Sequence, residues 1–113
     1  MTYKEKYSQI NKSLQKIGGE RPDFMINFGS LHKYATANSS LNRKNRELIA
    51  LGISISTQCD KCICFHMHDC FEAGASRDEI MDCIEVAVLM GGGPALMYAT
   101  QAYDAMNEYY PPV

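Results

Sequence analysis

The sequence has no long apolar run, and none approaches the ~20 residues that a helix needs to span a bilayer. Its N-terminus, MTYKEKYSQI, is charged and lacks the apolar segment of a signal peptide. Lysine and arginine number 11 against 13 aspartate and glutamate residues, and no basic run is interleaved with aromatic residues. These absences argue against nucleic acid and membranes as partners, and we expect a cytoplasmic protein.

Strand-like alternation is also nearly absent, and the chain has no internal repeat or credible domain boundary. We therefore expect a single domain covering residues 1–113. Apolar residues recur at steps of three and four, which predicts amphipathic helices. The expected fold is all-α, a compact bundle of about six helices: residues 3–17, 22–35, 43–57, 59–74, 76–90 and 94–110.

Glycines and polar caps set the ends of these predicted helices. The glycine pair at 18–19 is expected to stop the first helix, and the triple glycine at 91–93 to separate the last two. Asn42 is placed to cap the third helix, and Ser76 with Glu79 forms a capping box that satisfies free backbone amides. The second helix is expected to present one apolar face, made of Phe24, Met25, Phe28, Leu31 and Ala35.

The helices predicted at 43–57, 76–90 and 94–110 are apolar around most of their surface. A surface helix of a small monomer needs only one apolar stripe. Three central helices are hard to arrange in so small a domain, so this excess of apolar surface predicts a homo-oligomer.

Cysteine, by contrast, is abundant, with an odd number of five residues clustered between positions 59 and 83. A secreted disulfide framework spreads an even number along the chain. In a reducing compartment, such a cluster more often binds a metal or carries thiol chemistry. One interpretation is therefore a zinc site made of Cys59, Cys62 and His66, with His68 as a fourth ligand. Against it, the second cysteine pair of a structural zinc site is missing, and His68 would point about 160° away from His66 on a helix.

The redox interpretation fits the spacing better, and we assign no metal. With Cys59 near the N-cap of a helix and Cys62 in its first turn, the two thiols lie within bonding reach, and the helix dipole favours a thiolate. His66 follows Cys62 by four residues, where it could take the thiol proton. Glu47, in the preceding helix, is either exposed at the end of that helix or buried with a partner. Antiparallel packing of the two helices would not bring Glu47 directly to Cys59.

The segment RKNRELIALGISISTQCDKCICFH resembles the carboxymuconolactone decarboxylase family, in particular its alkylhydroperoxidase D-like branch. That branch carries a Glu, eleven residues, a Cys-x-x-Cys pair, three residues and a His. Glu47, Cys59, Cys62 and His66 match this pattern at every spacing. EAGASRDEI and VAVLMGGGPALMYA are also similar to the family, so the resemblance covers roughly residues 22–108.

The resemblance implies an all-helical fold that assembles into trimers or hexamers, and a thiol oxidoreductase that needs no bound cofactor. It implies that Cys62 attacks a hydroperoxide or disulfide substrate and that Cys59 then closes an internal disulfide with it. An external dithiol or thiol would reduce this bond, and His66 and Glu47 would form a proton relay. The decarboxylase namesakes lack the cysteine pair, which argues against lactone decarboxylation.

Lys61 departs from the family pattern, because the best-known hydroperoxidases carry a His of the relay at that place. Whether a peroxide or a disulfide is the main substrate therefore stays open. His32 and His68 are expected to be surface or helix-packing residues. Two other functions are alternatives: a metal-binding or redox-sensing module that uses the Cys/His cluster, and a ring-opening lactone decarboxylase. The remaining cysteines are expected to be reduced residues of the core: Cys64, Cys70 and Cys83.

Overall fold

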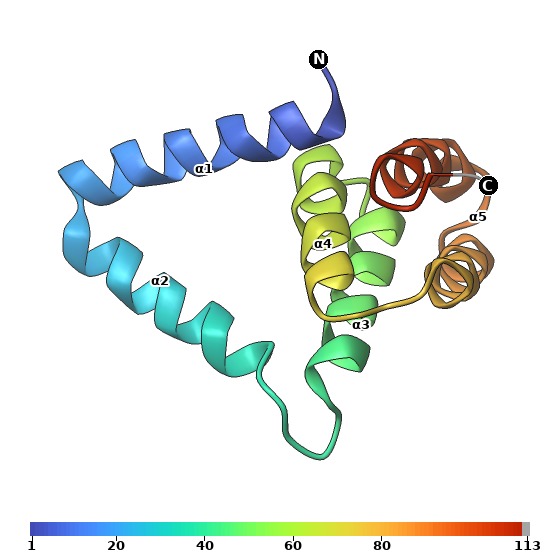
Figure 1. The fold of residues 1–113 in the computed structure, drawn as a ribbon, viewed down its shortest axis with the longest axis horizontal. Helices are drawn as coiled ribbons and strands as arrows, with labels where there is room; N and C mark the ends of the chain where they lie inside the picture. The colour runs from blue at the N-terminus through green and yellow to red at the C-terminus, as the bar shows by residue number, and fades with distance from the viewer. Residues whose placement is uncertain (112–113) are drawn as a thin grey trace.

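The chain folds into five α-helices, and the computed structural model, which describes residues 1–111, contains no strand among them (Figure 1). This confirms the all-α prediction. In chain order the helices are α1 (Tyr3–Glu20), α2 (Pro22–Ala35), α3 (Arg43–Ser56), α4 (Asp60–Glu72) and α5 (Arg77–Tyr109). The predicted break between the last two helices is present at Gly92, where the backbone is non-helical, and the segments on either side of it share the label α5.

Helix α5 is interrupted at the triple glycine that was expected to separate the last two helices. Gly92 has φ 73° and ψ −157°, a conformation that residues with a side chain rarely adopt. Pro94 follows two residues later and removes one backbone donor from the same turn. A glycine and a proline this close together interrupt the helical backbone, and a second helical segment then runs to Tyr109.

The end of α1 also differs from the prediction, because the helix passes through Gly18 and Gly19 to Glu20. A glycine inside a helix lowers the stability of the helix by only about 1 kcal/mol relative to alanine, so the helix can continue through it. The helix ends instead at Arg21, which has φ −135° and ψ 71° and precedes Pro22, where helical geometry is disfavoured.

The predicted helix caps are confirmed. The Asn42 side chain accepts a hydrogen bond from the Asn45 amide at 2.8 Å, at the start of α3. Ser76 and Glu79 form a reciprocal capping box at the start of α5, with bonds of 3.1 and 2.8 Å. Helices α3 and α5 therefore begin where the sequence predicts.

The core belongs to the three C-terminal helices. Neither α1 nor α2 contains a buried residue, whereas α3, α4 and α5 all do. These three helices pack against one another, and each also contributes side chains with no exposed surface. The largest of the buried apolar side chains are Leu51, Ile55, Ile63, Met67, Ile80 and Met106.

The first two helices form an arm, the α1–α2 arm, that is fixed to the core mainly at its base. The Glu108 carboxylate accepts the backbone N–H groups of Tyr3 at 2.8 Å and Lys4 at 3.0 Å, and so caps the start of α1. Lys6 pairs with Asp60 at 3.2 Å, in the first turn of α4. From there α1 runs away from α4, and α2 returns towards the start of α3 (Figure 1).

The core helices leave large apolar side chains in solvent, as their composition predicts. Because the structure describes a single chain, the homo-oligomer stays a prediction. The large exposed apolar side chains on α3 and α5 are Ile49, Ile53, Val86, Leu89, Met90, Leu96, Met97 and Tyr103.

By length and composition, α5 could also cross a bilayer. One such helix is weak evidence, because core helices of soluble proteins pass the same test. The inner side of α5 packs on α3 and α4, and the helix bends at Gly92. The cytoplasmic location stays a prediction.

Candidate active site around the Cys59–Cys62 pair

A tight connection between α3 and α4 places the cysteine pair. The end of α3 is a Schellman motif, in which the Gln58 amide donates to the Ile55 carbonyl at 3.1 Å and the Cys59 amide to the Ser54 carbonyl at 3.0 Å. Gln58 has φ 59°, a left-handed conformation that usually requires glycine. Cys59 is then the N-cap of α4, and its sulfur accepts the Cys62 amide at 3.3 Å. The backbone therefore holds both cysteines at the first turn of α4.

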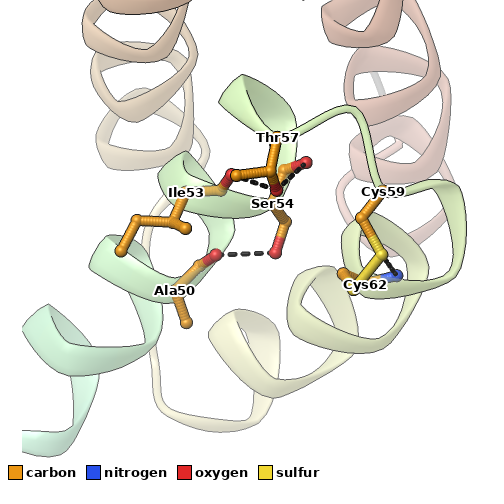
Figure 2. Close-up of a disulfide and its surroundings, with 6 residues drawn as sticks. All are labelled: Ala50, Ile53, Ser54, Thr57, Cys59 and Cys62. Atoms are coloured by element: carbon orange, nitrogen blue, oxygen red, sulfur yellow. Dashed lines mark hydrogen bonds between the residues drawn. A yellow bond between two sulfur atoms is a disulfide. The ribbon is translucent and has the colours of Figure 1, made fainter.

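Cys59 and Cys62 form a disulfide in the structure (Figure 2). The last turns of α3 lie next to it, and the buried Ser54 donates its hydroxyl to the Ala50 carbonyl at 2.7 Å. The structure thus puts Cys59 at the N-cap and Cys62 in the first turn, as the spacing predicts.

Glu47 and His66 meet between the two helices. The Glu47 carboxylate is 1% exposed, and its Oε2 lies 3.5 Å from Nδ1 of His66. Of the two positions open to Glu47 from the sequence, the structure therefore shows the buried one with a partner. Packing of α3 on α4 brings Glu47 to His66, in the middle of α4.

Two further residues lie at this place that the sequence did not indicate. Nε2 of His32, on α2, lies 3.8 Å from Oδ2 of Asp69, on α4. The rings of His32 and His66 are near-parallel, with centroids 6.2 Å apart and an interplanar angle of 24°. His32, which was expected to be a surface or helix-packing residue, packs its ring between α2 and α4, where it also meets Phe65 edge-on. The spacing of three residues between His66 and Asp69 was a usable signal, since it puts both on one helix face.

A cavity of about 340 Å³ separates the α1–α2 arm from α4. Cys62 and His66 both line it, so this sulfur and the imidazole share one opening. Its walls come from three helices and are mainly apolar: Ile10, Leu14, Met25, Phe28, Gly29, His32, Lys61, Cys62, Phe65 and His66.

The face that α2 turns to this cavity differs from the predicted one. Met25, Phe28 and His32 line the cavity. Phe24 and Leu31, which were expected to share the apolar face, are 60% and 62% exposed. The arm packs loosely, so the apolar pattern of α2 did not identify which side chains face α4.

The zinc ligands considered from the sequence do not converge in this structure. The Cys59 and Cys62 sulfurs are bonded to each other. His68 lies on another side of α4 from His66, as the helix geometry predicts, and stacks on Tyr7 of α1 with ring centroids 3.8 Å apart.

The other three cysteines are free thiols, as predicted. Cys64 and Cys70 are buried, and Cys83 is half-buried. Burial raises the pKa of Cys64 to about 11 and that of Cys83 to about 11, and it raises the pKa of Cys70 as well. Cys64 and Cys83 direct their sulfurs to the carbonyls of Tyr3 and Leu48, each at 3.1 Å.

Fold and site together define an all-helical protein with a Cys-x-x-Cys pair at a helix start and a Glu–His pair one turn further along. The sequence profile of the Carboxymuconolactone decarboxylase family matches residues 22–105. The chain belongs to this family, as its resemblance to the family indicated.

Individual relatives extend this result. An uncharacterized protein of Cupriavidus necator is 33% identical over 92% of this chain and 95% of its own length. The alkyl hydroperoxide reductase AhpD of Mycobacterium marinum is more distant: it is 27% identical over 63% of this chain and only 40% of its own length.

Solved structures share the whole fold. A carboxymuconolactone decarboxylase family protein from Legionella pneumophila has a TM-score of 0.90 and 37% identity, covering 95% of this chain and 96% of that one. A family member from Thermotoga maritima, whose description links it to an antioxidative response, has a TM-score of 0.83 and 25% identity, covering 93% and 90% of the two chains.

Proposed function

We propose that the protein is a thiol oxidoreductase that cycles Cys59 and Cys62 between two thiols and a disulfide. One observation carries this proposal: Cys62 opens into the same cavity as His66, whose ring is in contact with the buried Glu47. The distant similarity to AhpD, an alkyl hydroperoxide reductase by name, supports the same reaction class.

In the reduced protein, His66 accepts the thiol proton of Cys62, and Glu47 stabilises the resulting imidazolium. With a hydroperoxide, the Cys62 thiolate attacks the terminal oxygen, the O–O bond breaks, and the alkoxide leaves as an alcohol after taking the proton from His66. Cys62 is now a sulfenic acid. The Cys59 thiol attacks this sulfur, water leaves, and the disulfide forms.

A disulfide substrate requires the same groups. The Cys62 thiolate attacks one substrate sulfur and forms a mixed disulfide, and the other substrate sulfur leaves as a thiol. Cys59 then displaces the second thiol and closes the internal disulfide. Both routes transfer two electrons from the cysteine pair to the substrate. Lys61, at the cavity wall, is compatible with either route.

An external dithiol completes the cycle. It attacks Cys62, because Cys62 and not Cys59 is among the residues that line the cavity. Cys59 leaves as a thiolate, and the Cys62 amide, 3.3 Å from its sulfur, stabilises that charge together with the start of α4. A second attack within the dithiol releases Cys62 and the oxidised reductant.

We also propose that the protein works as a homo-oligomer, a trimer or a hexamer by its resemblance to the family. A groove of about 510 Å³ runs between α3 and α5 and is lined by apolar side chains that include Ile53, Val86 and Met90. A second copy covering this groove would remove the exposed apolar surface from water. Sedimentation equilibrium is expected to give an oligomer at micromolar concentration, and a monomer there would contradict this proposal.

Turnover of two oxidants tests the proposed reaction. Reduced protein is supplied with dithiothreitol and either cumene hydroperoxide or a small aromatic disulfide, and oxidant consumption is followed. We expect catalytic consumption of at least one oxidant. In Cys59→Ser, turnover is expected to collapse, with Cys62 accumulating as a sulfenic acid or a mixed disulfide that mass spectrometry detects. Consumption of neither oxidant by the wild-type protein would contradict the proposal.

A further inference from the structure

We propose that His32, His66 and Asp69 form a binding site for one divalent transition-metal ion of the zinc class. One ligand atom from each of the three residues lies within 4.8 Å of the other two. The residues come from two helices, His32 from α2 and the other two from α4. This set shares only His66 with the zinc ligands that the sequence suggests.

The donor set matches the chemistry of such an ion. Two imidazoles and one carboxylate are ligands that Zn²⁺, Co²⁺ and Fe²⁺ accept, and three protein ligands leave positions open to water. Asp69 is 8% exposed, so its carboxylate is not a freely solvated surface group. It lies between two imidazoles, with Oδ1 at 3.1 Å from Nδ1 of His68 and Oδ2 at 3.8 Å from Nε2 of His32.

A second observation is the state of His32. Its Nε2 is buried and has no hydrogen-bond partner within the part of the chain that the structure describes. The 3.8 Å separation from Asp69 is too long for a hydrogen bond. A buried imidazole nitrogen without a partner is costly, and a metal ion bound between His32 and Asp69 would satisfy it.

A third observation is the contact between His66 and Glu47. Nδ1 of His66 lies 3.5 Å from the buried Glu47 carboxylate, which leaves the other ring nitrogen available to a ligand. Metal-binding histidines usually donate their second ring N–H to a carboxylate in this way, which fixes the tautomer and raises the basicity of the ligand.

Binding requires the three ligands to come closer together. A tetrahedral ion with bonds of about 2.0–2.2 Å holds neighbouring donors roughly 3.3 Å apart. The α1–α2 arm can supply this movement, because α2 has no buried residue. The ion would thus connect α2 to α4 across the cavity. Where the proposed redox function holds, a bound ion would also withdraw His66 from Cys62 and slow its reaction.

Cobalt titration of the oxidised protein tests the site, because Cys59 and Cys62 are then bonded to each other and offer no thiolate. We expect one Co²⁺ per chain, seen as visible d–d absorption that Zn²⁺ abolishes. Asp69→Asn and His32→Gln keep the side-chain shapes, and each is expected to weaken binding about a hundredfold. Glu47→Gln should weaken it about tenfold, as a ligand's own partner does. Asp60→Asn is the matched control, because this α4 carboxylate pairs with Lys6 and with none of the three ligands, and it should bind as the wild type does.

Hydrogen exchange gives a readout that does not depend on cobalt spectra. Zinc should slow amide exchange in α2 of the wild-type protein and leave α2 unchanged in His32→Gln. The proposal is overturned if no cobalt binds up to millimolar concentration, if sulfur-to-cobalt absorption appears, or if either Asp69→Asn or His32→Gln binds as tightly as the wild type. None of these outcomes bears on disulfide cycling, which the turnover of oxidants tests separately.

Discussion

The five cysteines lie close together in the sequence but in two contrasting surroundings. Cys59 and Cys62 start α4, where a backbone amide points at sulfur and a cavity reaches Cys62. The other three lie within or beside the core, and burial raises the pKa of each. Because the thiolate is the reactive form, the position on the helix and the access to solvent separate reactive cysteines from inert ones.

The first prediction removes one member of each group. Cys62→Ser should abolish turnover, by about a thousandfold or more, because no other thiol shares the cavity with His66 in the described structure. Cys64→Ala, two residues further along α4, should keep turnover within a few-fold of the wild type. Steady-state rates with a hydroperoxide or a disulfide measure both. Equal losses of turnover in the two variants would contradict the division into reactive and inert cysteines.

The second prediction uses pH to move the inert group towards reactivity. With a pKa of about 11, the thiols of Cys64 and Cys83 should be alkylated several hundredfold faster at pH 11 than at pH 8 in the native protein. Iodoacetamide labelling with peptide mapping measures this.

The same two thiols should also affect stability. Their folded-state pKa lies above the ordinary value of 9.0, so their contribution to stability is complete below pH 9 and is lost as the pH rises towards 11. The thermal midpoint should therefore fall across that range. A midpoint that stays flat from pH 9 to 11 would mean that the two thiols are not protected by burial.

The third prediction concerns the base that activates the reactive group. His66→Ala should slow alkylation of Cys62 near neutral pH about a hundredfold, the usual effect of losing a positioned base. His68→Ala is the control, because its ring stacks on Tyr7 at the other side of α4. Iodoacetamide rates against pH in the reduced proteins decide. Slow alkylation of Cys62 in His68→Ala, with a normal rate in His66→Ala, would show that the reactive face of α4 is assigned wrongly.

The fourth prediction weakens the support of that base. Glu47→Gln keeps the shape of the buried side chain but loses its charge, and it should slow Cys62 alkylation about tenfold, equivalent to about 1.4 kcal/mol. The effect is smaller than that of His66→Ala, since Glu47 acts only through the imidazole. An unchanged rate would remove Glu47 from the relay.

The fifth prediction has the smallest effect and concerns how the reactive pair is held. The two Schellman ends compare directly: α4 ends with Gly74 at φ 86°, and α3 ends with Gln58 at φ 59°. Gln58→Gly should relieve left-handed strain and raise stability by about 0.5–1 kcal/mol, with part of the gain offset by the more flexible unfolded chain. Chemical denaturation measures it, and destabilisation would show that the glutamine side chain itself supports the turn.

These features differ in how far the sequence could predict them. The caps at Asn42 and Ser76 and the placement of the cysteine pair follow from local rules, and the spacing of Glu47 to His66 identified residues that do meet. The break at Gly92 also follows from a local rule, because the triple glycine and Pro94 predict it and the backbone at Gly92 is non-helical. His32 reaches the site only through the path of the α1–α2 arm, and few buried contacts fix that path.

The central claim is that Cys59 and Cys62 react as a pair while the other cysteines stay out of the reaction. Mass spectrometry of the fully reduced protein, before and after one equivalent of a hydroperoxide or a small disulfide, tests this most directly. The account predicts rapid loss of two thiols and a single Cys59–Cys62 disulfide, with Cys64, Cys70 and Cys83 still reduced. Unchanged thiols with both oxidants, or a disulfide that includes Cys64, would contradict it.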